Sequence, residues 1–320
     1  MQNTLKKILI AVDGSEQSFE TVRYVAQLFP QRQAKVFLLH VLSRIPDTMW
    51  DLYSDPDLRY KLLEFPAWKS AQKKAIEGFM DRASIFLEKA GYPTSQVFTL
   101  VKDRKTGITR DIIAEAKKGY DALVVGRRGM TPLRDLILGS TTSKLVNSLS
   151  HLPLWVVGGR PDPKRILVAM DHSDSSIGTL EYMGKLLDVT KKELLLFHAI
   201  RELPISFLQE GASAGSRKVK DLLVKMRGQV DAERELMQSF FEQRIRSLEK
   251  KGMDASRIST KIVTGVTSRA GSVIEEAQKG GYGTIVVGRR GLSRVRQFTA
   301  GRVSDKVVQM ARETAVWVVN

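Results

Sequence analysis

The chain contains the same sequence twice, and this duplication limits its fold more than any other feature. Lys7–Ser15 (KILIAVDGS) returns as Arg165–Ser173 (RILVAMDHS), and Ala122–Gly129 (ALVVGRRG) returns as Thr284–Gly291 (TIVVGRRG). The offset is 158 residues at the first pair and 162 at the second. Such self-similarity predicts two structural units of one ancestry. Two shorter blocks repeat in the same order: Val36–Val41 as Leu194–Ala199, and Leu154–Val157 as Val316–Val319.

A short linker separates the two copies. Gly158–Pro163 (GGRPDP) follows the last apolar run of the first copy, and its glycine and proline content is typical of a domain boundary. Each copy is then about 160 residues long, which suits one hydrophobic core. We therefore predict two domains, residues 1–158 and 159–320.

Within each copy, short apolar runs alternate with amphipathic stretches. The runs are rich in Val, Ile and Leu and lack strict alternation, as is typical of strands buried on both faces of a parallel sheet. This order predicts right-handed βαβ units and a doubly wound, five-stranded parallel α/β sheet in each domain. In the first copy the predicted strands are Ile8–Val12, Val36–Leu42, Val97–Val101, Leu123–Val125 and Leu154–Val157, and the predicted helices are Ser15–Phe29, Lys61–Ala90, Thr106–Lys118 and Ser140–Ser150.

Composition excludes several classes of protein. There is no cysteine, which rules out disulfides, thiolate metal sites and cysteine nucleophiles. No apolar run approaches the ~18 to 20 residues of a membrane span, and the first run ends too early for a signal peptide. We therefore expect a cytoplasmic protein with no membrane partner.

The net charge of +16 is divided evenly, with +8 in each half. A basic surface favours anionic partners. Evenly spaced Lys and Arg, however, are also typical of an ordinary solvated surface, and no RNA-recognition motif is present. The charge is compatible with nucleic-acid binding but does not by itself predict it.

The clearest chemical signal is a glycine-rich loop after the fourth predicted strand. Its spacing is Gly126-x2-Gly129-x9-Gly139, and Ser140 and Thr141 follow at the start of a predicted helix. Glycine lets a ligand approach the backbone, and a helix N-terminus offers N–H groups to a phosphate. Ligands of open α/β sheets bind beyond the carboxyl ends of the strands. The loop therefore predicts a nucleotide site at that edge.

Other motifs are missing. Neither a P-loop nor a G-x-G-x-x-G fingerprint follows the first strand, which disfavours P-loop and dinucleotide redox chemistry. Asp13 ends the first strand and can bond a ribose or adenine donor. We expect His40 and His198 to lie beside Asp13 and Asp171, each making one structural hydrogen bond. No further side chain stands at metal-ligand spacing, so no protein-built metal site is predicted.

The Asp13–Ser15 start, the loop spacing and the duplication together resemble the universal stress protein family over essentially the whole chain. The resemblance implies an adenine nucleotide alpha hydrolase-like fold with strand order 3-2-1-4-5. It also implies ATP, or ADP or AMP, as the ligand, with Mg2+ or Mn2+ bound through the phosphates.

Carried over to this sequence, the resemblance places Asp13 near the adenosine and Val41 against the base. The full nucleotide-binding set of the first domain is Asp13, Val41, Val125, Gly126, Arg128, Gly129, Gly139, Ser140 and Thr141. The corresponding set of the second domain is Asp171, Ala199, Val287, Gly288, Gly291, Gly301 and Arg302.

The two copies differ after the last glycine of the loop. Arg302 stands where the first copy has Ser140, so we expect the first site to be the more intact one. The arginine pairs Arg127–Arg128 and Arg289–Arg290 are expected to be exposed loop residues, with lining of a phosphate entrance as the alternative. The segments Leu42–Tyr60 and Arg201–Lys220, which differ most between the copies, are predicted lids.

The fifth predicted strands are apolar and each contains a tryptophan. An apolar edge strand favours pairing, so we predict that Leu154–Val157 and Val316–Val319 pair in an intramolecular pseudo-dimer, as the family resemblance also implies. The alternative is that each tryptophan fills the core of its own domain. A further homodimer is compatible with either arrangement.

These observations favour an ATP-binding stress or signalling protein without dedicated catalysis, because no general base, nucleophile dyad or carboxylate cluster is evident. One alternative is an interaction scaffold or RNA-binding stress protein that binds no nucleotide. Another is a weak ATPase or an autokinase that phosphorylates Ser140 or Thr141.

Overall fold

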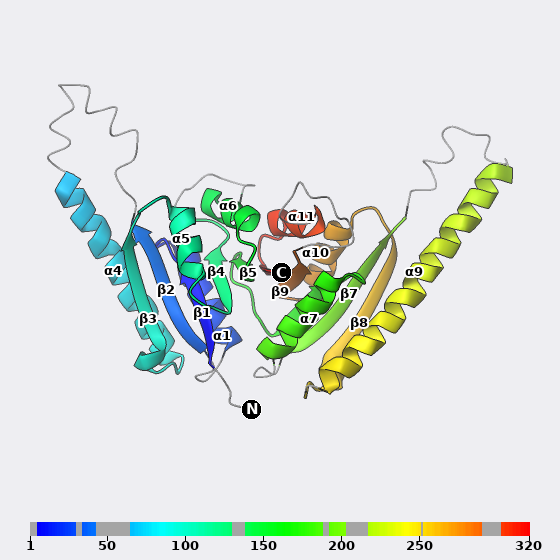
Figure 1. Ribbon diagram of the computed structural model, residues 1–320, viewed down its shortest axis with the longest axis horizontal. Helices are drawn as coiled ribbons and strands as arrows, with labels where there is room; N and C mark the ends of the chain where they lie inside the picture. Colours follow the sequence, from blue (N-terminus) through cyan, green and yellow to red (C-terminus); the bar gives the residue numbers. More distant parts are fainter. Residues whose placement is uncertain are drawn as a thin grey trace, which may run out of the picture. The chain divides into compact units, whose positions relative to one another are not determined.

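The computed structural model describes residues 5–29, 34–42, 65–129, 138–187, 192–202, 217–250, 252–289 and 302–320. The chain divides into two compact units, Met1–Arg160 and Pro161–Asn320. Each unit alternates strands and helices along the chain (Figure 1). The two predicted lids fall almost entirely outside the described residues.

In the first unit the strands lie in the order β3-β2-β1-β4-β5, and each neighbouring pair is parallel. Helices α1 and α4 contact each other, and so do α5 and α6. This confirms the predicted doubly wound sheet and its 3-2-1-4-5 order. The elements are β1 (Lys6–Ala11), α1 (Glu16–Leu28), β2 (Ala34–Leu42), α4 (Phe65–Lys89), β3 (Val97–Asp103), α5 (Ile108–Ala116), β4 (Ala122–Gly126), α6 (Ser140–Ser148) and β5 (Leu154–Val157).

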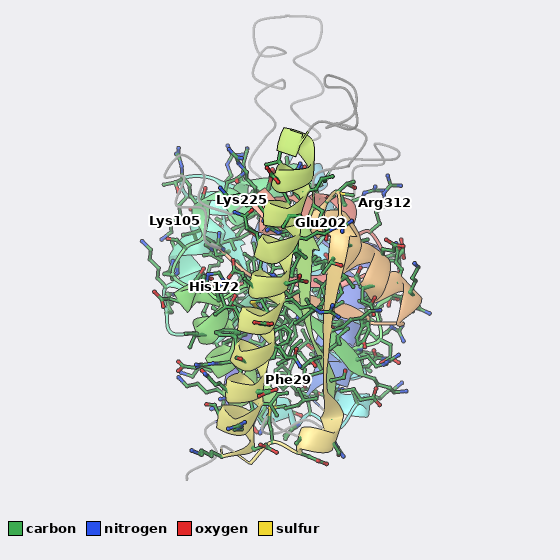
Figure 2. The ribbon with its side chains drawn as sticks, turned by 90° about the vertical axis from the view of Figure 1, so that its right-hand side faces the viewer. Phe29, Lys105, His172, Glu202, Lys225 and Arg312 are labelled. Atoms are coloured by element: carbon green, nitrogen blue, oxygen red, sulfur yellow. The ribbon has the colours of Figure 1, made fainter. Side chains whose placement is uncertain are left out.

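The second unit has the equivalent order, β8-β7-β6-β9-β10, again with parallel pairs. Its helix α9 packs against β7 and β8 (Figure 2). With 33 residues, α9 is longer than its counterpart α4, which has 25. The elements are β6 (Arg165–Ala169), α7 (Asp174–Leu187), β7 (Glu193–Arg201), α9 (Arg217–Glu249), β8 (Ile258–Val266), α10 (Arg269–Lys279), β9 (Thr284–Gly288), α11 (Arg302–Met310) and β10 (Ala315–Val319).

Local sequence signals fix the helix ends. The Ser15 side chain accepts a hydrogen bond from Ser18 N and so caps α1, as predicted. Gly91 follows α4 with φ of 96°, and Gly119 lies beyond α5 with φ of 82°. Both angles lie in the left-handed region, where a side chain is strained and glycine is favoured.

The tryptophans of β5 and β10 are fully buried. Trp155 stacks on Phe29 with ring centroids 6.2 Å apart, and Trp317 meets Tyr182 edge-on at 6.5 Å. Each tryptophan therefore packs against the first helix region of its own unit, as the alternative for the fifth strands anticipated. Pairing of the fifth strands with each other stays a prediction.

Among the helices that the structure describes, none combines the length and the apolar character needed to cross a bilayer.

Candidate functional site

The candidate site lies where the strand order of the first unit reverses. Strands β1 and β4 are parallel neighbours in the middle of the sheet, although β2 and β3 intervene in sequence. Asp13 follows the end of β1, and Gly126 is the last residue of β4. Such a switch point, at the carboxyl ends of the strands, is where open α/β sheets bind ligands.

Asp13 is held rigidly by the start of α1. Its Oδ1 accepts hydrogen bonds from Ser15 N (3.0 Å), Ser15 Oγ (2.6 Å) and Ser18 Oγ (2.7 Å). Asp13 N donates in turn to Ser18 Oγ at 3.0 Å. One carboxylate oxygen is therefore committed to the scaffold, which fixes the direction of the other.

The other oxygen, Asp13 Oδ2, lies against Gly129. A Cβ at position 129 would stand 2.1 Å from it, far inside van der Waals contact. Because three donors hold Oδ1, the carboxylate cannot simply rotate away. Glycine is thus required at position 129, and the loop and Asp13 lie together at the carboxyl ends of the strands.

The other two loop glycines also lie in tight places. A Cβ on Gly126 would be 3.2 Å from both Arg128 O and Gln17 Cγ, and one on Gly139 would be 3.3 Å from Arg127 O. Neither position has a left-handed φ, so close approach of neighbouring atoms, rather than backbone conformation, favours glycine at both.

Helix α6 begins at this edge. Gly139 is its N-cap, and Gly139 N donates to Arg127 O at 3.0 Å. Thr142 Oγ1 donates to Gly126 O at 2.9 Å and ties the first turn to the end of β4. Ser140 is exposed and Thr141 is half-buried. The N–H groups and hydroxyls of this turn are positioned to meet an anion.

Apolar and basic side chains complete the first site. Val41 and Val125, at the ends of β2 and β4, are buried. Arg128 is half-buried, and its Nε is a buried donor with no hydrogen-bond partner among the described residues. Loop residues 130–137 lie outside the described residues.

The prediction that the loop arginines are exposed is wrong for the first arginine of each pair. Arg127 is 3% exposed and Arg289 4%. Arg127 N donates to Val157 O, and Arg289 N to Val319 O. The residue after the fourth strand therefore still belongs to the sheet, which draws its side chain into the protein. Arg290 lies outside the described residues.

The second unit repeats the aspartate network. Asp171 Oδ1 accepts from Ser173 N (3.1 Å), Ser173 Oγ and Ser176 Oγ (2.9 Å), and Asp171 N donates to Ser176 Oγ at 3.0 Å. Ala199 and Val287 are buried in the places of Val41 and Val125.

The second glycine-rich loop is described only in part. Gly288 ends β9, whereas Gly291 and Gly301 lie outside the described residues. Arg302 is the first residue of α11 and is exposed. Arg302 therefore begins α11 in the second unit, as Ser140 begins α6 in the first.

The strand-end histidines have different surroundings. Nδ1 of His40 lies 2.8 Å from Val12 O, as predicted for a single structural hydrogen bond. Burial lowers the pKa of His40, while the bond to Val12 and the nearby Asp13 carboxylate act in the opposite direction. The electrostatic effect of Asp13 agrees with the expectation that the two residues are neighbours.

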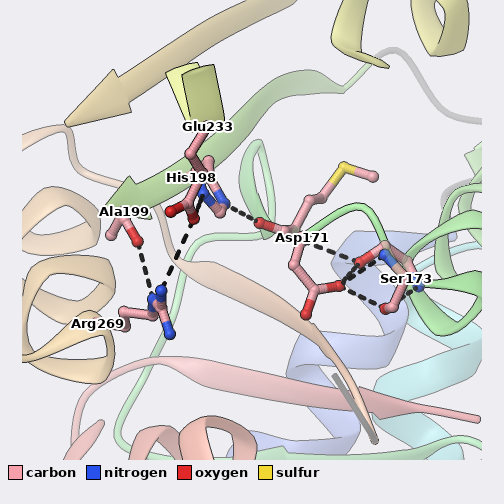
Figure 3. Close-up of polar contacts among 8 residues, drawn as sticks. Asp171, Ser173, His198, Ala199, Glu233 and Arg269 are labelled. Atoms are coloured by element: carbon pink, nitrogen blue, oxygen red, sulfur yellow. Dashed lines mark hydrogen bonds and ion pairs between the residues drawn. The ribbon is translucent and has the colours of Figure 1, made fainter. Parts of the chain in front are cut away.

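His198 makes two contacts instead of one. Its Nδ1 lies 2.6 Å from Met170 O, and its Nε2 lies 3.0 Å from Glu233 Oε1 (Figure 3). The same Glu233 oxygen is 3.7 Å from Arg269 Nη2, and Arg269 Nε donates to Ala199 O at 3.1 Å. This cluster was not predicted from the sequence, because its members are far apart and no short motif contains them.

Within the described parts of the chain, no group of three or more His, Asp or Glu side chains could hold a metal ion.

Comparison with known proteins follows the division into units. The model of the universal stress protein family matches residues 4–158 and, a second time, residues 163–320. The universal stress protein MJ0531 of Methanocaldococcus jannaschii is 28% identical over 162 residues, which cover 49% of this chain and 84% of the relative. YxiE of Bacillus subtilis is 26% identical over 166 residues, covering 47% and 97%.

The whole chain also resembles a solved structure. The crystal structure of a universal stress protein from Archaeoglobus fulgidus matches with a TM-score of 0.58 and 17% identity, covering 100% of this chain and 99% of the other. At that identity the likeness shows a shared fold. Together with the double family match, it gives the identity of both halves: the chain belongs to the universal stress protein family and carries two of its domains in tandem.

Proposed function

We propose that the protein binds an adenine nucleotide, ATP in the first instance, at the edge of the first unit formed by Asp13, Gly126, Gly129 and the start of α6. The observation that carries this proposal is the contact between Asp13 Oδ2 and Gly129, where no Cβ fits. A carboxylate fixed beside a glycine-rich loop offers an acceptor to a ribose and room for the backbone to approach phosphates.

The remaining residues of the site support the proposal by their chemistry. Val41 and Val125 give the apolar contact that a base requires. The buried Nε of Arg128 is a donor that a phosphate or ribose oxygen would satisfy. Ser140 and Thr141 present hydroxyls at a helix N-terminus. Mg2+ or Mn2+ would be bound through the phosphates and would neutralise part of their charge.

The proposal extends to the arrangement and role of the protein. The two family domains are residues 1–158 and 159–320, joined as a pseudo-dimer through their fifth strands. The nucleotide acts in the cytoplasm as a signal that is bound rather than turned over, in a stress response. The first unit is the principal site; it carries hydroxyls at Ser140 and Thr141, where the second unit has Arg302 and Val303.

The test begins with the purified, intact chain. It is denatured, and the released small molecules are identified by mass spectrometry; Mg-ATP binding is then measured by calorimetry. We expect about one adenine nucleotide per chain. Gly139→Asp should abolish binding, because it adds bulk 3.3 Å from Arg127 O and a negative charge at the anion site.

A matched glycine provides the control. A Cβ on Gly78, in the middle of α4, meets nothing within 4 Å, so Gly78→Ala should keep full binding. Absence of any bound nucleotide, with no thermal stabilisation by Mg-ATP, would refute the proposal. Salt-dependent RNA binding that persists in Gly139→Asp would favour the scaffold function instead, and phosphate release on incubation would favour the weak ATPase.

A further inference from the structure

The cluster around Arg269 occupies a polar position of the second unit at which the first unit has different side chains. Arg269 is the first residue of α10 and donates through Nε to the backbone oxygen of Ala199 at 3.1 Å. Its Nη2 lies 3.7 Å from the Glu233 carboxylate. Two acceptors from different elements, β7 and α9, thus hold the guanidinium over the end of β7 (Figure 3).

Glu233 is itself fixed by His198. The carbonyl of Met170 can only accept, so His198 Nδ1 donates to it. Nε2 lies 3.0 Å from the Glu233 oxygen and donates there when both ring nitrogens carry hydrogen. His198 is 4% exposed. A nearly buried side chain therefore positions the carboxylate, and the carboxylate positions Arg269.

The first unit has different residues at both places. Ile108 is the first residue of α5, as Arg269 is of α10. Gln72 is the counterpart of Glu233, because each residue precedes the glycine that follows its helix by the same number of positions. These glycines are Gly91 after α4 and Gly252 after α9. Isoleucine has no hydrogen to donate, so the Val41 carbonyl receives no such bond from the start of α5.

The position of Ala199 makes this difference relevant to ligand choice. Met170 N donates to Phe197 O just as Val12 N donates to Leu39 O. Alternate residues of a strand bond toward the same neighbour, so Ala199, like Val41, directs its peptide groups past the end of the first strand of its unit. An adenine lying there could donate from its exocyclic amino group to that carbonyl.

We propose that Arg269 is a specificity-determining residue that closes the base position of the second unit to adenine, with Glu233 and His198 as its positioning residues. The inference rests on the proposed function, because the base position is defined by Val41. The two units of one chain then differ in ligand. The first accepts adenine, and in the second Arg269 is sufficient to exclude it, whichever residue stands at position 302.

The experiment measures Mg-ATP stoichiometry by calorimetry on the intact chain. We expect one site in the natural chain and two in Arg269→Ile, which installs the residue type of Ile108. Arg302→Ser, which restores the residue type of Ser140, should leave one site. As a matched control, Arg246→Ile removes an exposed arginine elsewhere on the second unit and should also leave one site.

The converse change tests the same contact from the other side. Ile108→Arg should weaken ATP binding at the first unit about tenfold to a hundredfold, the effect of competition with one charged hydrogen bond. Ile108→Met, an unbranched side chain longer than isoleucine but without a donor, should bind within about threefold of the natural chain.

Three results would overturn the inference: two sites in the natural chain, no additional site in Arg269→Ile, or a second site opened by Arg302→Ser alone. Failure of the proposed function is distinguishable. If the proposed function is wrong, the natural chain shows no Mg-ATP site. In that case, one site gained in Arg269→Ile would still support closure of the second unit by Arg269. No gain in that variant would count against this closure.

Discussion

At the carboxyl edges of the two units, the hydrogen bonds around the strand-end aspartate are alike, but the side chains around the strand-end histidine differ. The hydrogen bonds of Asp13 and Asp171 agree in length within a few tenths of an ångström. In each unit the partners are the serines two and five residues after the aspartate. Around His40 and His198 the units differ, because the second unit adds Glu233 and Arg269.

This difference shows which contacts a duplication preserves. The aspartate network closes within one strand–helix turn, so its partners are copied together with it. Glu233 and Arg269 come from separate helices, where each can change without disturbing the strand ends. Ligand choice can therefore diverge while the fold remains the same.

The largest expected effect tests whether the two cores are equivalent. Trp155→Ala and Trp317→Ala should each cost about 3–5 kcal/mol of unfolding free energy, because each removes a fully buried indole and leaves a cavity. Urea unfolding followed by circular dichroism measures both. A cost below about 1 kcal/mol for either variant would show that the two cores are not alike.

The second prediction concerns a buried carboxylate of the first unit. Glu115 accepts from Lys102, from Lys118 at 2.9 Å and from Tyr120 at 2.9 Å. Glu115→Gln should cost about 1.5–3 kcal/mol, since the nearly buried carboxylate loses its charge-assisted hydrogen bonds, although both lysine partners are partly exposed. The counterpart Glu276, which pairs with Lys261 and is less buried, should cost clearly less on the same substitution.

The same carboxylate predicts a pH dependence. Burial alone would raise the pKa of Glu115, but the hydrogen bonds from Lys102, Lys118 and Tyr120 hold it at about 2, below its ordinary value of 4.5. The folded state then binds fewer protons, so this stabilisation is complete above pH 4.5 and is lost as the pH falls toward 2. The Glu115→Gln variant should therefore lose less unfolding free energy than the natural chain between pH 4.5 and pH 2. An equal loss in both proteins would contradict the lowered pKa of Glu115.

A smaller effect tests whether the shared scaffold is energetically the same. Ser18 and Ser176 are buried, and each bridges the amide and the carboxylate of its aspartate. Ser18→Ala and Ser176→Ala should each cost about 1–3 kcal/mol, because a buried donor and acceptor lose their partner. Costs that differ by more than about 1 kcal/mol would mean that equal geometry does not give equal stability here.

The smallest effect concerns His40, at the end of the second strand of the first unit. Because burial lowers the pKa of His40, its imidazole should titrate below 6.5. Its neutral form is favoured on folding, so the associated stability is present above pH 6.5 and declines as the pH falls through that value. Nitrogen-15 NMR of the imidazoles follows the titration. A His40 midpoint above 6.5 would contradict the burial of this ring.

Local patterns predicted the fold well, for identifiable reasons. The apolar runs became strands with boundaries shifted by at most a few residues; Leu154–Val157 was predicted without error. Ser15, Gly91 and Gly119 act where they were expected to, since caps depend on the residues next to them. The burial of Arg127 was mispredicted, because a Gly-Arg-Arg-Gly sequence reads as an exposed loop while its first arginine still hydrogen-bonds to β5.

The sequence by itself determined the two units, their parallel α/β sheets and the glycine spacing of the candidate sites, because these follow from repeats, periodicity and turn residues along the chain. The strand order was expected only from the resemblance to the universal stress protein family. Only the tertiary structure decided which side chains meet at each edge. The contact of Asp13 with Gly129, and that of Arg269 with Ala199 and Glu233, join residues that are distant in sequence. Such contacts depend on how helices pack against the sheet, and no local pattern encodes that packing.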